Sequence, residues 1–205
     1  MPYVGNDVVD LREPANAGKS RDSRFLKKIL TNAEIEFVKN AENPDAALWS
    51  LWACKETAYK VIKKSCLDAA FLPRQWTVFF KKSQSDFSDG EVMVLGKERV
   101  YIRLFSNFNY VHCIGADCLA ALNKLIWSVD TLPEKEKINP SLYLRYFLGQ
   151  SLAKHFFLNF HHIKIKRTRR CGELQPPHVY VDGRKTDIEI SLSHDGRFVT
   201  YAFIP

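Results

Sequence analysis

Several features are missing from this sequence of 205 residues, and each absence narrows the class of protein. No run of about 18 apolar residues occurs, so we expect no membrane-spanning helix. The first residues carry neither the basic nor the apolar segment of a secretory signal, and we expect a cytoplasmic protein. The five cysteines include no C-x-x-C pair, so neither a zinc site nor a disulfide framework is predicted.

Basic residues are in excess over acidic residues, with a formal net charge of +7. Such an excess favours an acidic protein, a nucleic acid or a phosphorylated ligand as the partner. Basic side chains concentrate in residues 164–170, which could serve any of these ligands. A nucleic-acid-binding protein therefore stays open as an alternative at this point.

The spacing of apolar residues predicts an α+β protein. A long helix is expected from Asn43, a suitable N-cap before Pro44, to about Lys64. A second long helix is expected over residues 141–159. Alternating segments, typical of antiparallel strands, follow each helix, so a degenerate internal repeat is indicated. The expected strands cover residues 3–11, 75–81, 91–95, 99–105, 110–116, 164–166, 179–181, 188–194 and 198–204.

Residues 129–140 are charged and contain Pro133 and Pro140, so we interpret them as a linker. The first half then spans residues 1–128 and the second half spans residues 141–205.

The first long helix places an acid between aromatic side chains. Trp52, Glu56 and Lys60 are spaced i, i+4, i+8 and share one face of the helix. Burying a carboxylate there is costly unless a cation or a metal meets it. A surface Glu56–Lys60 ion pair is the alternative, and this stretch alone does not decide between them.

The N-terminal strand carries two acids. With a period of two, Gly5, Asp7 and Val9 share one face of the strand. Asp7 then lies among small and apolar neighbours, although a turn or edge acid is the alternative. Asp10 is expected to be a solvated acid at the end of the strand.

Residues 5–10 (GNDVVD), 52–60 (WACKETAYK) and 191–198 (SLSHDGRF) together resemble the signatures of the 4'-phosphopantetheinyl transferase superfamily. Those signatures are G-x-D near a strand end, W-x-x-K-E-x-x-x-K on a helix and S-x-S-H at a hairpin. The order of the segments is that of the short, holo-acyl-carrier-protein-synthase type. The length is that of the long type, so the resemblance implies two α+β halves that form a pseudo-dimer, each with a long helix on an antiparallel sheet.

The resemblance implies a reaction and a metal. The family transfers 4'-phosphopantetheine from coenzyme A to a serine of an acyl or peptidyl carrier protein, uses magnesium and releases 3',5'-ADP. On this resemblance Asp7 and Glu56 hold Mg²⁺, while Val9 stands where the long type has a third acid. Glu56, directly or through a water, is the expected base for the serine, and Lys60 is expected to neutralise the α-phosphate and to protonate the leaving group.

The resemblance also assigns coenzyme A contacts. Ser193 and His194 are expected at the 3'-phosphate, and Arg169 and Arg170 at the adenosine phosphates. Lys55 is offset by about 100° from Glu56 on the helix, so we expect it to reach the phosphates or the carrier from the side. The family's G-K-P loop is replaced by residues 172–177, which leaves the contacts of that loop open.

The expected partners are coenzyme A and an acidic carrier protein that surface Lys and Arg attract, with no nucleic acid and no membrane. A fused pseudo-dimer has little need of a second copy, so a monomer is expected. Carriers of fatty-acid, polyketide and nonribosomal-peptide synthesis fit equally. The alternatives are an inactive relative that binds coenzyme A or a carrier protein, and a nucleic-acid binder that uses residues 164–170.

Overall fold

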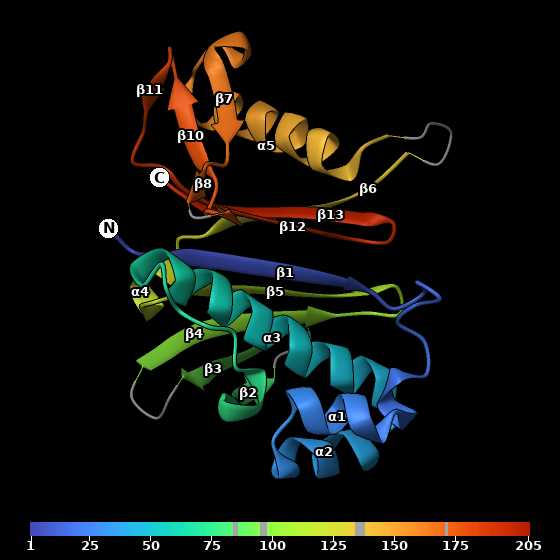
Figure 1. Ribbon diagram of the computed structural model, residues 1–205. Coiled ribbons are helices and arrows are strands. Elements are labelled where there is room, and N and C mark those ends of the chain that lie inside the picture. The colour runs from blue at the N-terminus through green and yellow to red at the C-terminus, as the bar shows by residue number, and fades with distance from the viewer. Residues whose placement is uncertain (84–85, 95–97, 134–137, 171) are drawn as a thin grey trace.

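The computed structural model describes residues 1–83, 86–94, 98–133, 138–170 and 172–205. Helices and antiparallel sheets occur in both parts of the chain, so the predicted α+β class is confirmed. Figure 1 shows the two parts stacked on each other, with strand β1 (Val4–Asp10) at their junction.

The first part is built on a five-stranded antiparallel sheet with the order β1-β5-β4-β3-β2. The predicted meander is confirmed, and β1 joins it as an edge strand by pairing with β5. The meander strands are β2 (Thr77–Ser83), β3 (Ser88–Val94), β4 (Glu98–Ser106) and β5 (Tyr110–Ala116).

Helix α3 (Pro44–Ser65) crosses one face of this sheet (Figure 1). It begins as predicted, because the Asn43 side chain accepts a hydrogen bond from the backbone N–H of Ala46. Its apolar face packs into the first core, which includes Leu51 and Val61. Around it lie the short helices α1 (Ser23–Ile29) and α2 (Asn32–Lys39) and the 3₁₀ turns η1 (Lys19–Arg21) and η2 (Pro73–Gln75).

Two glycines bring α3 close to the sheet. Gly5 and Gly115 are paired across β1 and β5. A Cβ on Gly5 would overlap the backbone carbonyl of Thr57, and one on Gly115 would lie 2.7 Å from the Thr57 side chain. This close approach explains the glycine two residues before Asp7, because it brings Asp7 near α3.

The second part places α5 (Pro140–Phe156) against a three-stranded sheet with the order β12-β13-β6. The predicted hairpin at Asp195 and Gly196 joins β12 (Glu189–Asp195) to β13 (Phe198–Ile204). A smaller sheet has the order β11-β10-β7. The remaining elements are α4 (Leu119–Leu122), η3 (Phe160–His162), β7 (Ile163–Lys166), β8 (Arg169–Arg170), β9 (Glu173–Leu174), β10 (His178–Val181) and β11 (Arg184–Lys185).

The boundary expected after residue 128 falls inside a strand. β6 (Ile126–Thr131) pairs with β13, so the start of the expected linker belongs to the second sheet. Only residues 127–130 of this segment alternate between apolar and polar, and pairing with β13 makes it a strand. Residues 134–137 of the expected linker lie outside the described part.

A small apolar cluster joins the two parts. It combines Val4 of β1 and Ile114 of β5 with Ala202 and Ile204 of β13. The two parts therefore share buried surface along β1, in addition to the separate cores under α3 and α5. Among the described residues, no helix is long and apolar enough to cross a membrane.

Candidate active site

Asp7 and Glu56 line the same cavity, of about 250 Å³. Asp7 comes from β1, Glu56 from α3, and His194 reaches the cavity from β12 in the second part of the chain. Three sequence segments that lie far apart thus meet at one place. The other lining residues are Val8, Val9, Asn16, Trp49, Trp52 and Asp195.

Asp7 is held by contacts from both parts of the chain. Its Oδ1 atom accepts a hydrogen bond of 2.8 Å from Lys60 Nζ and one of 2.7 Å from Ser193 Oγ. Lys60 Nζ also donates to the Asn6 carbonyl at 2.8 Å. Lys60 is thus fixed one helical turn beyond Glu56, on the face that the spacing predicted.

Glu56 has a pKa well above the usual value for a glutamate. Burial raises its pKa, the negative charge of Asp7 raises it further, and Lys60 lowers it, with a result of about 7. Among the described residues, no hydrogen bond or ion pair to the Glu56 carboxyl is found. A group with this pKa can exchange a proton near neutral pH.

The two carboxylates fit a divalent cation. The negative charge of Asp7 raises the pKa of Glu56. A cation bound by both carboxylates would neutralise these charges. Mg²⁺ is often bound by one or two carboxylates, with waters and substrate phosphates as its other ligands. No cluster of three or more His, Cys, Asp or Glu residues with metal-binding geometry occurs in the described part, and the side chain at position 9 is that of valine.

His194 faces a surplus of positive charge. Burial and the charge of Lys60 lower its pKa, Asp195 opposes this, and Arg145 and Arg167 lower it further. His194 is exposed, and cations gathered around an accessible imidazole are typical of an anion-binding site. The Ser193 hydroxyl donates a hydrogen bond to Asp7, and its predicted contact with coenzyme A stays a prediction.

A second cavity of about 190 Å³ begins at Glu56 and contains cations that the motifs did not single out. Lys63, Lys64 and Arg167 line it together with Lys60. The spacing of Lys60 and Lys64 on the helix was a usable signal, and Arg167 lies within the basic stretch. The remaining lining residues are Tyr59, Leu174, Pro176, Pro177, Ser191 and Leu192.

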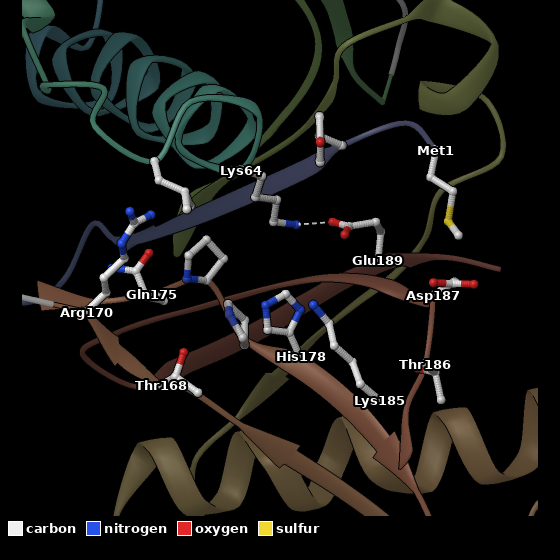
Figure 2. A pocket seen from close by; sticks show the side chains of 14 residues that line it. Met1, Lys64, Thr168, Arg170, Gln175, His178, Lys185, Thr186, Asp187 and Glu189 are labelled. Carbon is white, nitrogen blue, oxygen red and sulfur yellow. Dashed lines mark hydrogen bonds and ion pairs between the residues drawn. The ribbon is translucent and has the colours of Figure 1, made fainter.

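A third cavity of about 510 Å³ continues from the second, because Lys64, Pro176 and Pro177 line both. Figure 2 shows Lys64 bridged to Glu189 at its centre, a contact of 2.9 Å. Arg169 and Arg170 are both exposed, and only Arg170 lines this cavity. Arg169 donates to the Gly172 carbonyl at 2.8 Å. The three cavities form one groove between the two parts of the chain.

Lys55 does not reach this groove, contrary to the expectation from the helix offset. Its side chain is fully buried, and Nζ donates to Glu34 Oε2 at 2.6 Å and to the carbonyls of Ile29 and Pro73. Helices α1 and α2 pack on that side of α3, so this lysine joins them instead of facing solvent.

Asp10 is likewise not a solvated acid, because its carboxyl is 1% exposed and bonded to Arg197. Burial alone would raise its pKa, but hydrogen bonds from Arg197 and from the Arg12 backbone outweigh burial and lower the pKa to about 2.

The fold and the site together define a class. This is an α+β protein in which carboxylates from one half and a histidine from the other meet in a cation-lined groove. The family model of the 4'-phosphopantetheinyl transferase superfamily matches residues 3–110, which is more than half of the chain. The chain therefore belongs to this superfamily, and the resemblance noted in its motifs is confirmed.

Curated relatives match a shorter region. A holo-[acyl-carrier-protein] synthase of Leptospira biflexa is 32% identical over 62 residues, which cover 30% of this chain and 49% of that protein. A holo-[acyl-carrier-protein] synthase of Campylobacter fetus is 36% identical over 59 residues, which cover 29% of this chain and 48% of that protein. The chain thus spans about half the length of the curated relatives it matches.

Proposed function

We propose that this protein transfers the 4'-phosphopantetheine group from coenzyme A to a serine of an acyl or peptidyl carrier protein, with Mg²⁺, and releases 3',5'-ADP. Membership of the superfamily and the similarity to holo-[acyl-carrier-protein] synthases support this reaction class. The observation that carries the proposal is the cavity in which Asp7 and Glu56 face His194.

Asp7 and Glu56 are the residues that would hold Mg²⁺. When bound there, the cation supplies positive charge to the pyrophosphate of coenzyme A.

Glu56 is the proposed general base. Its carboxylate would accept the proton of the carrier serine, directly or through a water. The serine oxygen then forms a bond to the phosphorus of the pantetheine phosphate, and the pyrophosphate P–O bond breaks. The electron pair leaves on 3',5'-ADP, whose phosphate Lys60 would neutralise from the adjacent turn of α3.

The adenosine end is proposed to lie along the second and third cavities. Lys63, Lys64 and Arg167 offer cations to its phosphates, and Pro176 and Pro177 form an apolar wall. His194 would meet the 3'-phosphate, which suits the surplus of positive charge around it.

An acidic carrier protein is proposed to dock beside Trp52. This side chain lines the cavity of Asp7 and Glu56 and also a groove of about 430 Å³ that it forms with residues of α1 and η2. The groove combines apolar Phe71 and Leu72 with basic Lys28 and Arg74. It would therefore accept an acidic helix with an apolar side chain, next to the proposed base.

Intact-mass spectrometry of a small apo-carrier protein tests the proposal. The carrier is incubated with this protein, coenzyme A and Mg²⁺, with and without a chelator. We expect a mass gain of one phosphopantetheine group that disappears with the chelator and with Asp7→Asn. Full activity of an Asp7→Ala, Glu56→Ala double variant, or no gain with several carriers, would overturn it.

A further inference from the structure

The free edge of β1 faces β12 without a backbone ladder between them. β1 pairs with β5 on its other side, and β12 belongs to a different sheet. Side chains of β12 at every second position bond to β1 instead. Ser191 Oγ accepts from the Asn6 N–H at 2.9 Å, and Asp195 Oδ2 accepts from the Asp10 N–H at 2.9 Å.

The register of these two strands decides whether the proposed site exists. Asp7 touches Ser193 through one hydrogen bond, and His194 is the next residue on β12. A strand edge held by side chains has fewer constraints on sliding than a paired edge. Further contacts are therefore needed to fix the position of β1 against the hairpin of β12 and β13.

The ion pair between Asp10 and Arg197 provides these contacts. Arg197 donates from Nη2 to Asp10 Oδ1 at 2.7 Å, from Nε to Oδ2 at 2.8 Å and from its backbone N–H to Oδ2 at 3.0 Å. The hairpin comes so close that a Cβ on Gly196, where φ is 50°, would lie 2.5 Å from Asp10 Oδ2. A bidentate arginine–carboxylate pair has a fixed orientation, so it transmits position as well as charge.

Asn16 connects the Asp10–Arg197 ion pair to the wall of the cavity. Its side-chain amide donates to Asp195 Oδ2 at 2.7 Å and to the Asp10 carbonyl at 3.0 Å. The backbone carbonyl of Asn16 accepts a hydrogen bond from Trp49 Nε1 at 3.0 Å. Asn16, Trp49 and Asp195 all line the cavity that contains Asp7 and Glu56.

We propose that Asp10, Asn16, Asp195 and Arg197 form a clamp that sets the register of β1 against β12 and so holds Asp7 and Glu56 opposite His194. These are positioning residues, because Asp10 and Arg197 act through the strands that they join. The effect on catalysis rests on the proposed function, whereas the effect on the strand register does not.

The test compares two arginines in similar pairs. Arg197→Gln breaks the clamp, and Arg103→Gln breaks the bidentate Arg103–Asp89 pair in the first sheet, with contacts of 2.7 and 2.9 Å. We expect Arg197→Gln to lower kcat for carrier modification by about 10- to 100-fold, since small misplacements of reacting groups have effects of this size. Arg103→Gln should leave kcat unchanged, and Arg197→Lys should restore part of it.

Hydrogen exchange at the Asn6 amide supplies a readout that needs no activity. This amide bonds to Ser191 across the interface, whereas the Arg197 amide bonds to Asp10. The exchange of the Asn6 amide should become faster in Arg197→Gln than in Arg103→Gln. The Arg103→Gln variant is the control for a general loss of stability. Equal exchange in the two variants, or wild-type kcat in Arg197→Gln, would overturn the clamp. An inactive wild type would overturn the proposed function and leave the exchange result to decide the clamp.

Discussion

Two aspartates three residues apart on β1 have different environments. Asp7 faces the groove, where Lys60 and Ser193 bond to it, and Asp10 is enclosed by the hairpin of the second part. Their identity as acids does not distinguish them. Their partners do, because Asp7 is bonded by Lys60 and Ser193 beside Glu56, whereas Asp10 is bonded by Arg197 of the hairpin.

Glu56→Gln should abolish most of the transfer and stabilise the metal-free protein above neutral pH. Loss of a general base lowers the rate by about 100-fold or more. Folding raises the pKa of Glu56 to about 7 from an ordinary value of 4.5, so folding favours the protonated form. The stability of the wild type should therefore fall as the pH rises from about 4.5 through 7, and that fall should vanish in the variant.

Urea unfolding between pH 4 and pH 9 in chelator, together with the carrier assay, measures both effects. A wild-type rate in Glu56→Gln would exclude Glu56 as the base. The same pH dependence in both proteins would exclude it as the group that titrates.

Asp10→Asn should remove a contribution to the free energy of unfolding that the wild type loses only at acidic pH. The pKa of Asp10 falls from 3.8 to about 2 on folding, so its contribution is present above pH 4 and is lost as the pH falls toward 2. The shift corresponds to about 2 kcal/mol. Acid titration of the unfolding free energy should show a shallower decline below pH 4 in the variant, and an identical decline would contradict the ion pair with Arg197.

At the scale of elements, α3 divides its charged residues between two faces. Glu56, Lys60 and Lys64 line the groove at intervals of four residues. Lys55 points to the other side, where α1 and α2 cover it and Glu34 binds it. The helix is thus a wall of the proposed site on one face and part of the structural core on the other.

Lys55→Met should destabilise the fold without changing how coenzyme A binds. Removing the lysine leaves Glu34 buried without its cation, which costs about 3 kcal/mol. The matched control is Lys39→Met, which breaks the exposed Lys39–Glu36 pair and should leave the unfolding free energy nearly unchanged. Chemical denaturation gives the stabilities, and the KM for coenzyme A should equal that of the wild type. A raised KM for coenzyme A with an unchanged free energy of unfolding would indicate instead that Lys55 contacts the phosphates.

At the scale of the whole molecule, the groove exists because two halves meet along the edge of β1. The first half supplies the carboxylates and Lys60, and the second supplies His194 and Arg167. The chain as a whole carries a formal net charge of +7. An excess of positive charge attracts an acidic partner over a distance that depends on salt.

Salt should therefore weaken the use of the carrier protein more than the chemical step. Raising the ionic strength from 0.1 to 1 M shortens the Debye length from about 10 to 3 Å. We expect the KM for the carrier to rise several-fold while kcat changes little, and Arg74→Ala in the groove beside Trp52 to reduce that dependence. Steady-state assays over a salt series measure both constants, and a KM that does not respond to salt would argue against charge-steered docking.

Local signals in the sequence determined much of this structure. Asn43 and Pro44 begin α3, Asp195 and Gly196 form the hairpin, and the interval between Glu56 and Lys60 places them on one helical face. Each of these features depends on hydrogen bonds and geometry within a few residues, so a short stretch of sequence is enough to predict it. The three family motifs added the connection between distant segments, which spacing alone does not supply.

Only the tertiary structure decided which charges are buried and which face the groove. Asp7 and Ser193 are 186 residues apart in sequence, and Asp10 is enclosed by a hairpin from the other end of the chain. Lys55 and Lys60 lie on the same helix, yet the packing of α1 and α2 buries the first and leaves the second at the cavity. The free energy of a charged side chain depends on the solvent and the partners around it, and long-range packing selects both.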